Sequence, residues 1–321
     1  MIDIYTYKPG EVLRHTCDAG ELAKLIEDRE RVTWVDLEDP NEEETVLLET
    51  VFHFHTLAIE DCIHSRSFPK IDVFEDHLFL VVHGILLDRE KRDFANSPVN
   101  LFLGRNYLVT QHPLPVRSIR STKALLAKSD SIIARGPDFL MHTILDFLVD
   151  NYQPILDEMD EIIDEIEHRI VEHPEQEVLR DILGFKRTLQ RMRRISSYQK
   201  EILNRLSRED FNVIDPKLQI YFRDVFDHLV RVTDLADSYK EVLASALEAY
   251  LTVVSNRLNE VMKVLTVIST ILLPLATISS ILGMNLEFPF RANTAAFWAT
   301  VVLMAFVATG MLLYFRRRRW F

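Results

Sequence analysis

Two long uncharged runs near the C-terminus dominate the pattern of hydrophobic and polar positions. Residues 264–282 and 294–315 contain no Asp, Glu, Lys or Arg. Each run is long enough to cross about 30 Å of hydrocarbon as a helix. The cluster Arg316 to Arg319 follows the second run, and the positive-inside rule places such a cluster in the cytoplasm. The pattern therefore predicts a two-helix hairpin with the preceding part of the chain on the cytoplasmic side.

A regular apolar seam leads into the first of these runs. Asp215 and Pro216 form a helix start, an N-cap residue followed by Pro at the first helical position. Apolar residues then recur in alternating steps of four and three, at Leu218, Phe222, Val225, Leu229, Val232, Ala236, Tyr239, Leu243, Ala246 and Tyr250. One helix is predicted over residues 216–282. The seam implies bundling with other helices, and the pattern leaves open whether these are helices of other copies or the chain's own two preceding helices.

The segment before this helix predicts two antiparallel helices of opposite charge. On the first, apolar residues 155, 159, 162, 166 and 170 share one face, and acidic residues crowd the remainder. The second is basic, with Arg180, Lys186, Arg187, Arg191, Arg193 and Arg194. Side by side, the two helices would neutralise each other. The acidic face has two interpretations, a solvated helix surface or a cation-attracting surface next to an ion path.

Strand-like and helix-like patterns alternate over residues 1–130. Segments such as "RVTWVDL" and "HLFLVVHGILL" are rich in β-branched and aromatic residues, whereas "NEEETVLLETVFH" has the pattern of an amphipathic helix. The predicted fold class is therefore an α+β cytosolic domain, followed by long stalk helices and a two-helix C-terminal transmembrane hairpin.

Composition narrows the classes of function. The chain has 37 basic and 49 acidic residues, a net charge of −12, which argues against nucleic acid as a partner and for attraction of cations. Cys17 and Cys62, the only cysteines, suit a reducing compartment. The sequence has no Gly-rich phosphate loop and no recognisable arrangement of nucleophile, base and orienting group, so we do not expect an enzyme.

A stripe of small and polar residues continues the seam into the first uncharged run. Its members are Asn259, Met262, Thr266, Ser269, Leu273, Ala276 and Ser280, with Leu265, Thr270 and Thr277 beside them. Small and polar residues in a membrane helix commonly serve close helix packing. The alternative is a water-filled pathway lined by identical helices. Such a pathway would offer only neutral oxygens, which suit hydrated Mg²⁺ because this ion gives up its water shell reluctantly.

Several motifs together resemble the CorA family of magnesium transporters. Gly283-Met284-Asn285 ends the first span, a short loop and a second span follow, and the chain closes with "LYFRRRRWF". The resemblance extends to "YFRDVFDH" and to "LAIEDCIHSRSFPKI", so it covers most of the chain. It implies a funnel-shaped homopentamer in the inner (plasma) membrane, with both termini cytoplasmic, that carries Mg²⁺ inward down the membrane potential.

The resemblance also assigns roles to residues of the pore. Gly283, Met284 and Asn285 match the selectivity ring at the outer mouth, where hydrated Mg²⁺ first binds. Asn259, Met262 and Leu265 match inner pore positions, the last two forming a hydrophobic gate. The remaining pore-lining positions are Thr266, Ser269, Leu273, Ala276, Thr277 and Ser280.

A regulatory Mg²⁺ site is implied between neighbouring subunits. Asp61 in "IEDCI" and Asp224 in "YFRDVFD" match the pair that holds this ion, and Glu60 and Asp146 match secondary acidic positions. With the ion bound, the acidic surfaces of adjacent subunits are bridged. Without it they repel, and the closed ring loosens, so that cytosolic Mg²⁺ switches off its own entry.

The chain departs from the family at its outer loop and in its first span. The loop reads "LEFPFRAN", with Glu287 as its one acid and Arg291 opposing it. Ala276 stands where the family has Thr, with Thr277 one place later. Softer ligands, His53, His55, Cys62 and His64, lie near Asp61 in sequence, but their spacing is not that of a complete zinc site.

Other functions remain open from the residues alone. Co²⁺ or Ni²⁺ could pass as well as Mg²⁺. A zinc transporter of the same superfamily, with or without proton coupling, is one rival, and a tail-anchored scaffold without transport is another.

The sequence divides into six predicted segments. These are a cytosolic α/β domain over 1–130, antiparallel helices over 131–215, a stalk helix over 216–282 with its membrane part from about 261, an outer loop over 283–293, a second transmembrane helix over 294–315 and a basic tail over 316–321. The predicted partners are other copies of the chain, divalent cations and the lipid bilayer.

Overall fold

The computed structural model describes residues 1–321 except 64–67, 89–92, 285–293, 319 and 321. The chain divides into two compact units. One comprises Met1–Arg169 with Glu175–Ala246, and the other comprises Ile170–Pro174 with Leu247–Phe321.

Strands lie in the first unit, and helices occur in both. The strands are β1 (Ile2–Tyr7), β2 (Arg14–Thr16), β3 (Val32–Glu38), β4 (Lys70–Val73), β5 (Leu78–Asp88), β6 (Asp93–Leu103) and β7 (Tyr107–His112). The α-helices are α1 (Leu22–Glu27), α2 (Glu42–Thr50), α3 (Thr56–Ile63), α4 (Arg117–Leu126), α5 (Pro137–Asp150), α6 (Gln153–Glu172), α7 (Gln176–Arg208), α8 (Gln219–Leu282) and α9 (Thr294–Arg317). Short 3-10 turns are η1 (Ala19–Glu21), η2 (Ile133–Arg135) and η3 (Pro216–Leu218).

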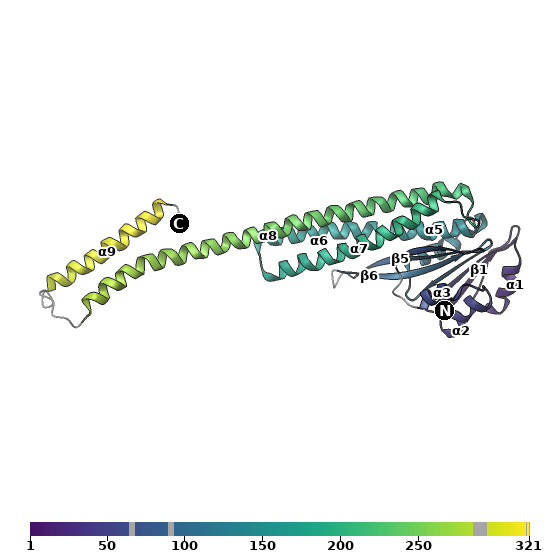
Figure 1. The fold of residues 1–321 in the computed structure, drawn as a ribbon, viewed down its shortest axis with the longest axis horizontal. Helices are drawn as coiled ribbons and strands as arrows, with labels where there is room; N and C mark the ends of the chain where they lie inside the picture. The colour runs from purple at the N-terminus through teal and green to yellow at the C-terminus, as the bar shows by residue number, and fades with distance from the viewer. Residues whose placement is uncertain (64–67, 89–92, 285–293, 319, 321) are drawn as a thin grey trace. The chain divides into compact units, whose positions relative to one another are not determined.

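The strands form one mixed sheet in the order β2-β1-β3-β7-β6-β5-β4 (Figure 1). Strands β3 and β7 pair in parallel, and the other neighbouring pairs are antiparallel. Strand β1, next to the edge strand β2, alternates buried and half-buried residues, whereas the central strand β7 is buried at every residue from Leu108 to His112. This difference is expected when both faces of the sheet centre are covered.

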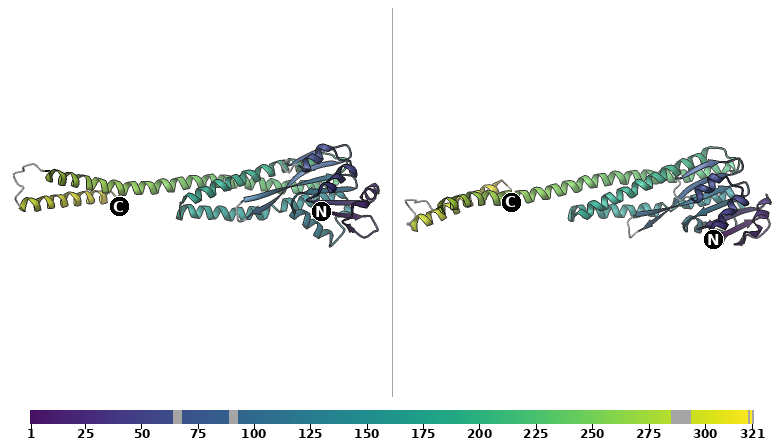
Figure 2. Two further views of the ribbon diagram at one scale, coloured as in Figure 1. Left: turned by 90° about the horizontal axis from the view of Figure 1, so that it is seen from below. Right: turned by 60° about the horizontal axis from the view of Figure 1, so that its bottom comes forward.

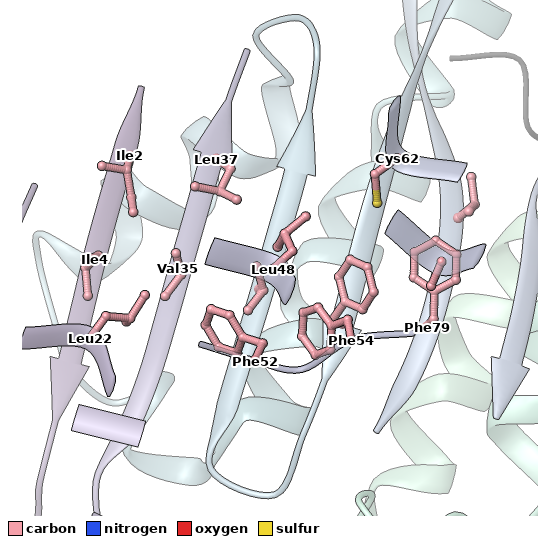
Figure 3. Close-up of a cluster of buried hydrophobic side chains, with 14 residues drawn as sticks. Ile2, Ile4, Leu22, Val35, Leu37, Leu48, Phe52, Phe54, Cys62 and Phe79 are labelled. Carbon is pink, nitrogen blue, oxygen red and sulfur yellow. The ribbon is translucent and has the colours of Figure 1, made fainter. Parts of the chain in front are cut away.

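Helices α1, α2 and α3 bury one face of the sheet (Figure 3). Leu22, Leu48 and Cys62 project from these helices toward the strands, and the rings of Phe54 and Phe102 stack with centroids 4.0 Å apart. Helix α2 begins with a capping box. The Asn41 side chain accepts from the backbone of Glu44, whose carboxylate accepts from the backbone of Asn41.

Helices α5 and α7 pack on the other side of the sheet from α1 to α3 (Figures 1 and 2), and α4 packs against α5. Helix α5 starts with Pro137 directly after Gly136, which has φ +121°. A side chain at Gly136 would be strained at that φ, and a Cβ there would approach the carboxylate of Asp138 within 2.6 Å. This glycine therefore fixes where α5 turns onto the sheet.

The apolar seam of α8 is buried within the first unit. Leu218, Phe222, Val225, Leu229, Val232, Ala236, Leu243 and Ala246 are each at most 6% exposed. The rings of Phe222 and His142 meet edge to face, the Tyr239 hydroxyl donates to the backbone of Leu156 on α6, and Arg193 on α7 pairs with Asp237. The sequence left open whether the seam packs on helices of other copies or on the chain's own preceding helices. The structure shows that it packs on the chain's own helices.

Gln199 on α7 joins three elements of the first unit. Its Oε1 accepts from the backbone N–H of His83 on β5, and its Nε2 donates to the hydroxyl of the fully buried Tyr152. His83 lies opposite Pro98 and beyond Val81, the last residue of β5 that pairs with β4. The Gln199 amide therefore satisfies a buried strand N–H just beyond the end of the β4–β5 pairing.

The change Gln199→Leu is expected to lower the free energy of unfolding by about 2–4 kcal/mol, because it leaves the His83 N–H and the Tyr152 hydroxyl buried without this partner. Urea unfolding of the purified full-length chain, followed by circular dichroism, measures the effect. Gln190→Leu, at an exposed position of the same helix, is the matched control. Equal stability of the two variants would show that the Gln199 bonds contribute nothing.

Candidate ion pathway and acidic site

Two helices are long and apolar enough to cross a membrane. They lie within 216–282, whose most apolar window has mean hydropathy 2.1, and within Phe297–Arg317, with mean hydropathy 1.9. Only 6% and 0% of these windows are buried inside the chain. Exposed apolar helices of this length need another apolar environment, either a bilayer or further copies of the chain.

The stripe predicted from the sequence lies along one exposed face of α8. All seven stripe members are exposed within the single chain, and so are Leu265 and Thr277 beside them: Asn259, Met262, Thr266, Ser269, Leu273, Ala276 and Ser280. Leu273 is 73% exposed, more than Met262 or Leu265. At 100° per residue these positions fall on one side of the helix. The structure thus brings the stripe together as a continuous surface that the chain itself does not cover.

The residues that the chain does cover lie on a different side of α8. Val267 is 2% exposed, and Ile271, Pro274, Leu275 and Ile278 are half-buried. By helical rotation these positions lie on the side facing away from the centre of the stripe. The helix therefore presents a covered apolar side and an uncovered stripe.

Threonine hydroxyls on α8 bond to the helix backbone. The Oγ1 atoms of Thr266, Thr270 and Thr277 donate to the carbonyls four residues earlier, at 2.7, 2.7 and 2.8 Å. Each hydroxyl proton is thus engaged, while the oxygen keeps lone pairs that can accept a hydrogen bond. Thr266 and Thr277 consequently place acceptors on the stripe without adding charge.

Helix α8 ends at Leu282, one residue before the Gly-Met-Asn motif. The N–H of Gly283 still donates to the carbonyl of Ser279 at 2.9 Å, and that of Met284 donates to the carbonyl of Ile281 at 3.3 Å. A Cβ at Gly283 would approach the Ser279 carbonyl within 3.2 Å. Asn285 and Glu287, predicted for the outer mouth, lie outside the described residues.

An open hollow lies at the other end of the stripe. Asn259, Met262 and Thr266 line it together with Lys263 of the same helix and Trp320 of the C-terminal tail. The Trp320 ring packs against Phe315, with centroids 5.3 Å apart. The tail therefore lies close to the proposed inner pore residues, a contact that sequence spacing does not reveal.

A group of metal-ligating side chains lies between α5 and α8. One ligand atom each from Asp146, Asp150 and His228 lies within 4.8 Å of the others, and His228 Nδ1 is 3.9 Å from Asp150 Oδ1. Burial raises the pKa of Asp146, with further contributions from the carboxylates of Asp150 and Asp224. The structure therefore assembles the predicted Asp146 with two residues that the sequence did not single out.

A simple spacing in the sequence could have indicated the two missed residues, Asp150 and His228. Asp150 follows Asp146 by four residues on α5, and His228 follows Asp224 by four residues on α8. Positions four apart lie on the same helix face, so each predicted acid indicates a second candidate one turn later. Only the packing of α5 against α8 could show that the two faces meet.

Asp61 has a different environment. Its carboxylate pairs with Lys70 Nζ at 2.6 Å, and the same ammonium contacts Asp72 at 2.6 Å. Glu60, its neighbour on α3, is exposed. Neither acid belongs to the group of Asp146, so the described part of a single chain does not bring all four predicted regulatory residues together.

The histidines and cysteine near Asp61 do not form a metal group within the described residues. His53 and His55 are exposed, whereas Cys62 is buried in the core under the sheet, and His64 lies outside the described range.

These features fit a two-span membrane protein that has an acidic α/β domain and an uncharged polar stripe on its first candidate span. The chain belongs to the family described as "CorA-like Mg2+ transporter protein", whose model matches residues 29–317. Members of this family are transporters of divalent cations rather than enzymes.

Relatives and solved structures agree over nearly the whole chain. The Bacillus subtilis protein YfjQ is 31% identical over 90% of this chain and 89% of its own length. The cobalt/magnesium transport protein CorA of Thermotoga maritima is 30% identical over 99% of this chain and 92% of its own length. The solved structure of the CorA magnesium transporter from Methanocaldococcus jannaschii matches with a TM-score of 0.86 and 22% identity, covering 99% and 98% of the two chains. The predicted fold class and family are thereby confirmed.

The change Asp146→Asn is expected to stabilise the fold at neutral pH when divalent cations are removed. Because the pKa of Asp146 is raised, the folded chain holds this proton more tightly than the unfolded chain. The resulting penalty is absent well below the ordinary pKa of 3.8 and grows as pH rises through the folded value. Thermal unfolding in chelator, at neutral pH and at acid pH, measures this difference.

The matched control is Asp130→Asn, at an exposed position of the same unit. It removes one negative charge outside the group of Asp146 and should change the unfolding temperature little. A neutral-pH gain in both variants would trace the effect to net charge instead of burial.

Proposed function

We propose that this protein is a homopentameric Mg²⁺ channel that admits hydrated Mg²⁺ down the membrane potential. The observation that carries the proposal is the uncharged polar stripe of α8, which is exposed while the opposite side is covered by the chain itself. Five copies arranged around an axis would enclose such a stripe as a pore. Membership of the transporter family supports this interpretation over simple helix packing.

The chemistry of the stripe suits an ion that keeps its water shell. Threonine oxygens with engaged protons accept hydrogen bonds from bound water. Because the stripe carries no carboxylate, it would not trap a divalent cation by direct coordination. Asn285 would form the outer selectivity ring with Gly283 and Met284, and Glu287 would be the one acid of the mouth. Met262 and Leu265 would close the pore by excluding water, with Leu273 a further apolar constriction.

The driving force is electrical. Each charge that crosses a membrane potential of 100 mV gains about 2.3 kcal/mol, so a divalent ion gains about twice that without chemical fuel. In the proposed orientation both termini lie in the cytoplasm, Arg316 and Arg317 follow the second span there, and the acidic domain faces the ions that have entered. Co²⁺ and Ni²⁺, which are also divalent, could share the path.

Gating would depend on Mg²⁺ bound between subunits of the acidic domain. Asp146, Asp150 and His228 already converge within one chain, and the pKa of Asp146 responds to Asp224 nearby. Asp61 and Glu60 on α3 would approach this group from the neighbouring subunit. Because Lys70 already pairs with Asp61, an arriving ion would have to compete with an ammonium group, which lowers the affinity and keeps the site reversible.

Asn285→Ala is expected to reduce Mg²⁺ influx by about tenfold or more while the pentamer still assembles. A hydrogen bond to a charged partner contributes about 1.5–3 kcal/mol, and each 1.4 kcal/mol is tenfold in occupancy of the mouth. Flux into proteoliposomes under an imposed potential, with competing divalent ions and with or without a pH gradient, gives the measurement.

Asn293→Ala, in the same outer loop but outside the motif, is the matched control and should leave flux near the wild-type level. A scaffold would give no flux in any variant. Flux that requires a pH gradient, or that carries Zn²⁺ in preference to Mg²⁺, would favour the zinc transporter instead.

Asp224→Asn is expected to leave the channel open at Mg²⁺ concentrations that close the wild type, because one carboxylate of the intersubunit bridge is lost. Flux measured at stepwise internal Mg²⁺ concentrations checks this. Asp227→Asn, exposed and less than one turn further along α8, makes the same charge change and should keep normal closure. Unchanged inhibition in Asp224→Asn would remove this residue from the regulatory site.

A further inference from the structure

Strand pairing brings three different metal-ligating side chains together at the edge of the sheet. Strands β1 and β2 pair antiparallel, with Tyr5 opposite His15 and Ile4 opposite Thr16. Continuing this register places Asp3 opposite Cys17. Because alternate residues of a strand point to the same face, Asp3, His15 and Cys17 share one face of the pair.

The ligand atoms are close to the arrangement that a tetrahedral metal requires. Asp3 Oδ1 is 2.8 Å from His15 Nε2 and 3.6 Å from Cys17 Sγ, and one ligand atom from each residue lies within 4.8 Å of the others. Bond lengths of about 2.0–2.3 Å around tetrahedral zinc separate neighbouring ligand atoms by about 3.3–3.6 Å. The Asp3–Cys17 separation already matches, and His15 needs to retreat by about half an ångström.

Two neighbours hold this group in place. Lys123 Nζ binds the other oxygen of Asp3, Oδ2, at 2.6 Å, which leaves Oδ1 directed at His15 and Cys17. The ring of Tyr5 stacks on His15 with centroids 4.5 Å apart and planes 18° from parallel. Such outer contacts orient metal ligands in known sites. The same Lys123 also pairs with the buried Asp36, so its position is fixed from the core side.

Solvent and ions can reach the side chains of Asp3, His15 and Cys17, and their donor atoms favour Zn²⁺ or Co²⁺ over Mg²⁺. The side chain of His15 is 48% exposed and Cys17 is exposed, so solvent and ions reach both. A nitrogen, a sulfur and one carboxylate oxygen suit Zn²⁺ or Co²⁺, whereas Mg²⁺ demands six oxygen ligands in octahedral geometry. Its thiol distinguishes this donor set from the carboxylates and imidazole of the proposed regulatory site and from the neutral oxygens of the stripe.

We propose that Asp3, His15 and Cys17 form a binding site for a transition-metal dication, Zn²⁺ or Co²⁺, on the α/β domain, with water as the fourth ligand. On binding, the Cys17 thiol releases its proton to solvent, and any proton on His15 Nε2 passes to Nδ1 or to solvent so that the Nε2 lone pair can bind the metal. The site is separate from the ion pathway and does not depend on the proposed function.

The test is a Co²⁺ titration of the purified full-length protein in detergent with Mg²⁺ in excess, so that oxygen-only sites stay filled with Mg²⁺. Thiolate-bound Co²⁺ absorbs in the near ultraviolet, where cobalt bound only to oxygen and nitrogen does not. We expect a band that saturates at one Co²⁺ per chain. Cys17→Ser should abolish it, and His15→Gln or Asp3→Asn should weaken apparent binding about tenfold or more.

Cys62→Ser is the matched control, because Cys62 is the second free cysteine and is buried in the core. It should keep the band. No band in the wild type, or a band that survives Cys17→Ser, would overturn the proposal. As a second measurement, Zn²⁺ in excess Mg²⁺ should protect Cys17 from alkylation by iodoacetamide, read by mass spectrometry, and unprotected alkylation would contradict the site in the same way.

Discussion

Helix α8 is one continuous helix with one part in the α/β unit and another in the candidate membrane span. Its side chains must therefore suit water and protein along the first part and hydrocarbon along the second, and much of the structure depends on this constraint. In hydrocarbon, every backbone N–H and carbonyl must be paired within the protein, which favours an unbroken helix. Pro274 lies inside α8 and removes one donor, so the carbonyl of Thr270 loses its usual partner. In the first unit the same helix buries an apolar seam against its own chain. Its C-terminal part instead presents a stripe that a single chain leaves uncovered.

The two parts of α8 differ in side-chain size and polarity, which explains why the same residue spacing gives a buried seam in one part and an exposed stripe in the other. Alternating steps of four and three run from Leu218 to Tyr250 and again from Asn259 to Ser280, but the side chains change from mostly large and apolar to mostly small and polar. Large apolar residues gain free energy by burial in water, so the chain's own helices cover them. Small and polar residues gain little from burial against lipid tails, and in the proposed channel they would line the hydrated space that several copies enclose.

Sequence patterns predicted the elements better than they predicted the contacts. The long helix, the two apolar runs and the mixed domain are periodic or compositional, so the sequence indicated each of them. The burial of Phe222 and Val225 within the chain was left open, because a heptad seam does not name its partner. Asp150 and His228 were missed since their meeting depends on how α5 packs against α8. Likewise, the approach of Asp3 to Cys17 depends on the register in which β1 pairs with β2. The three residues of β2 carry too short a hydrophobic pattern to predict that register from the sequence.

The carboxylates near the candidate sites differ in the charged side chains that face them. Asp61 is paired with Lys70, Asp3 with Lys123, and Asp146 faces Asp150 with a histidine beside them. A carboxylate that already has an ammonium partner gains less from a metal ion than one that faces another carboxylate, because the ammonium must be displaced or repelled. Of these three acids, Asp146 therefore has the most to gain from a cation within a single chain. In the proposed pentamer, the carboxylate of Asp61 would add its charge to this group from the neighbouring subunit.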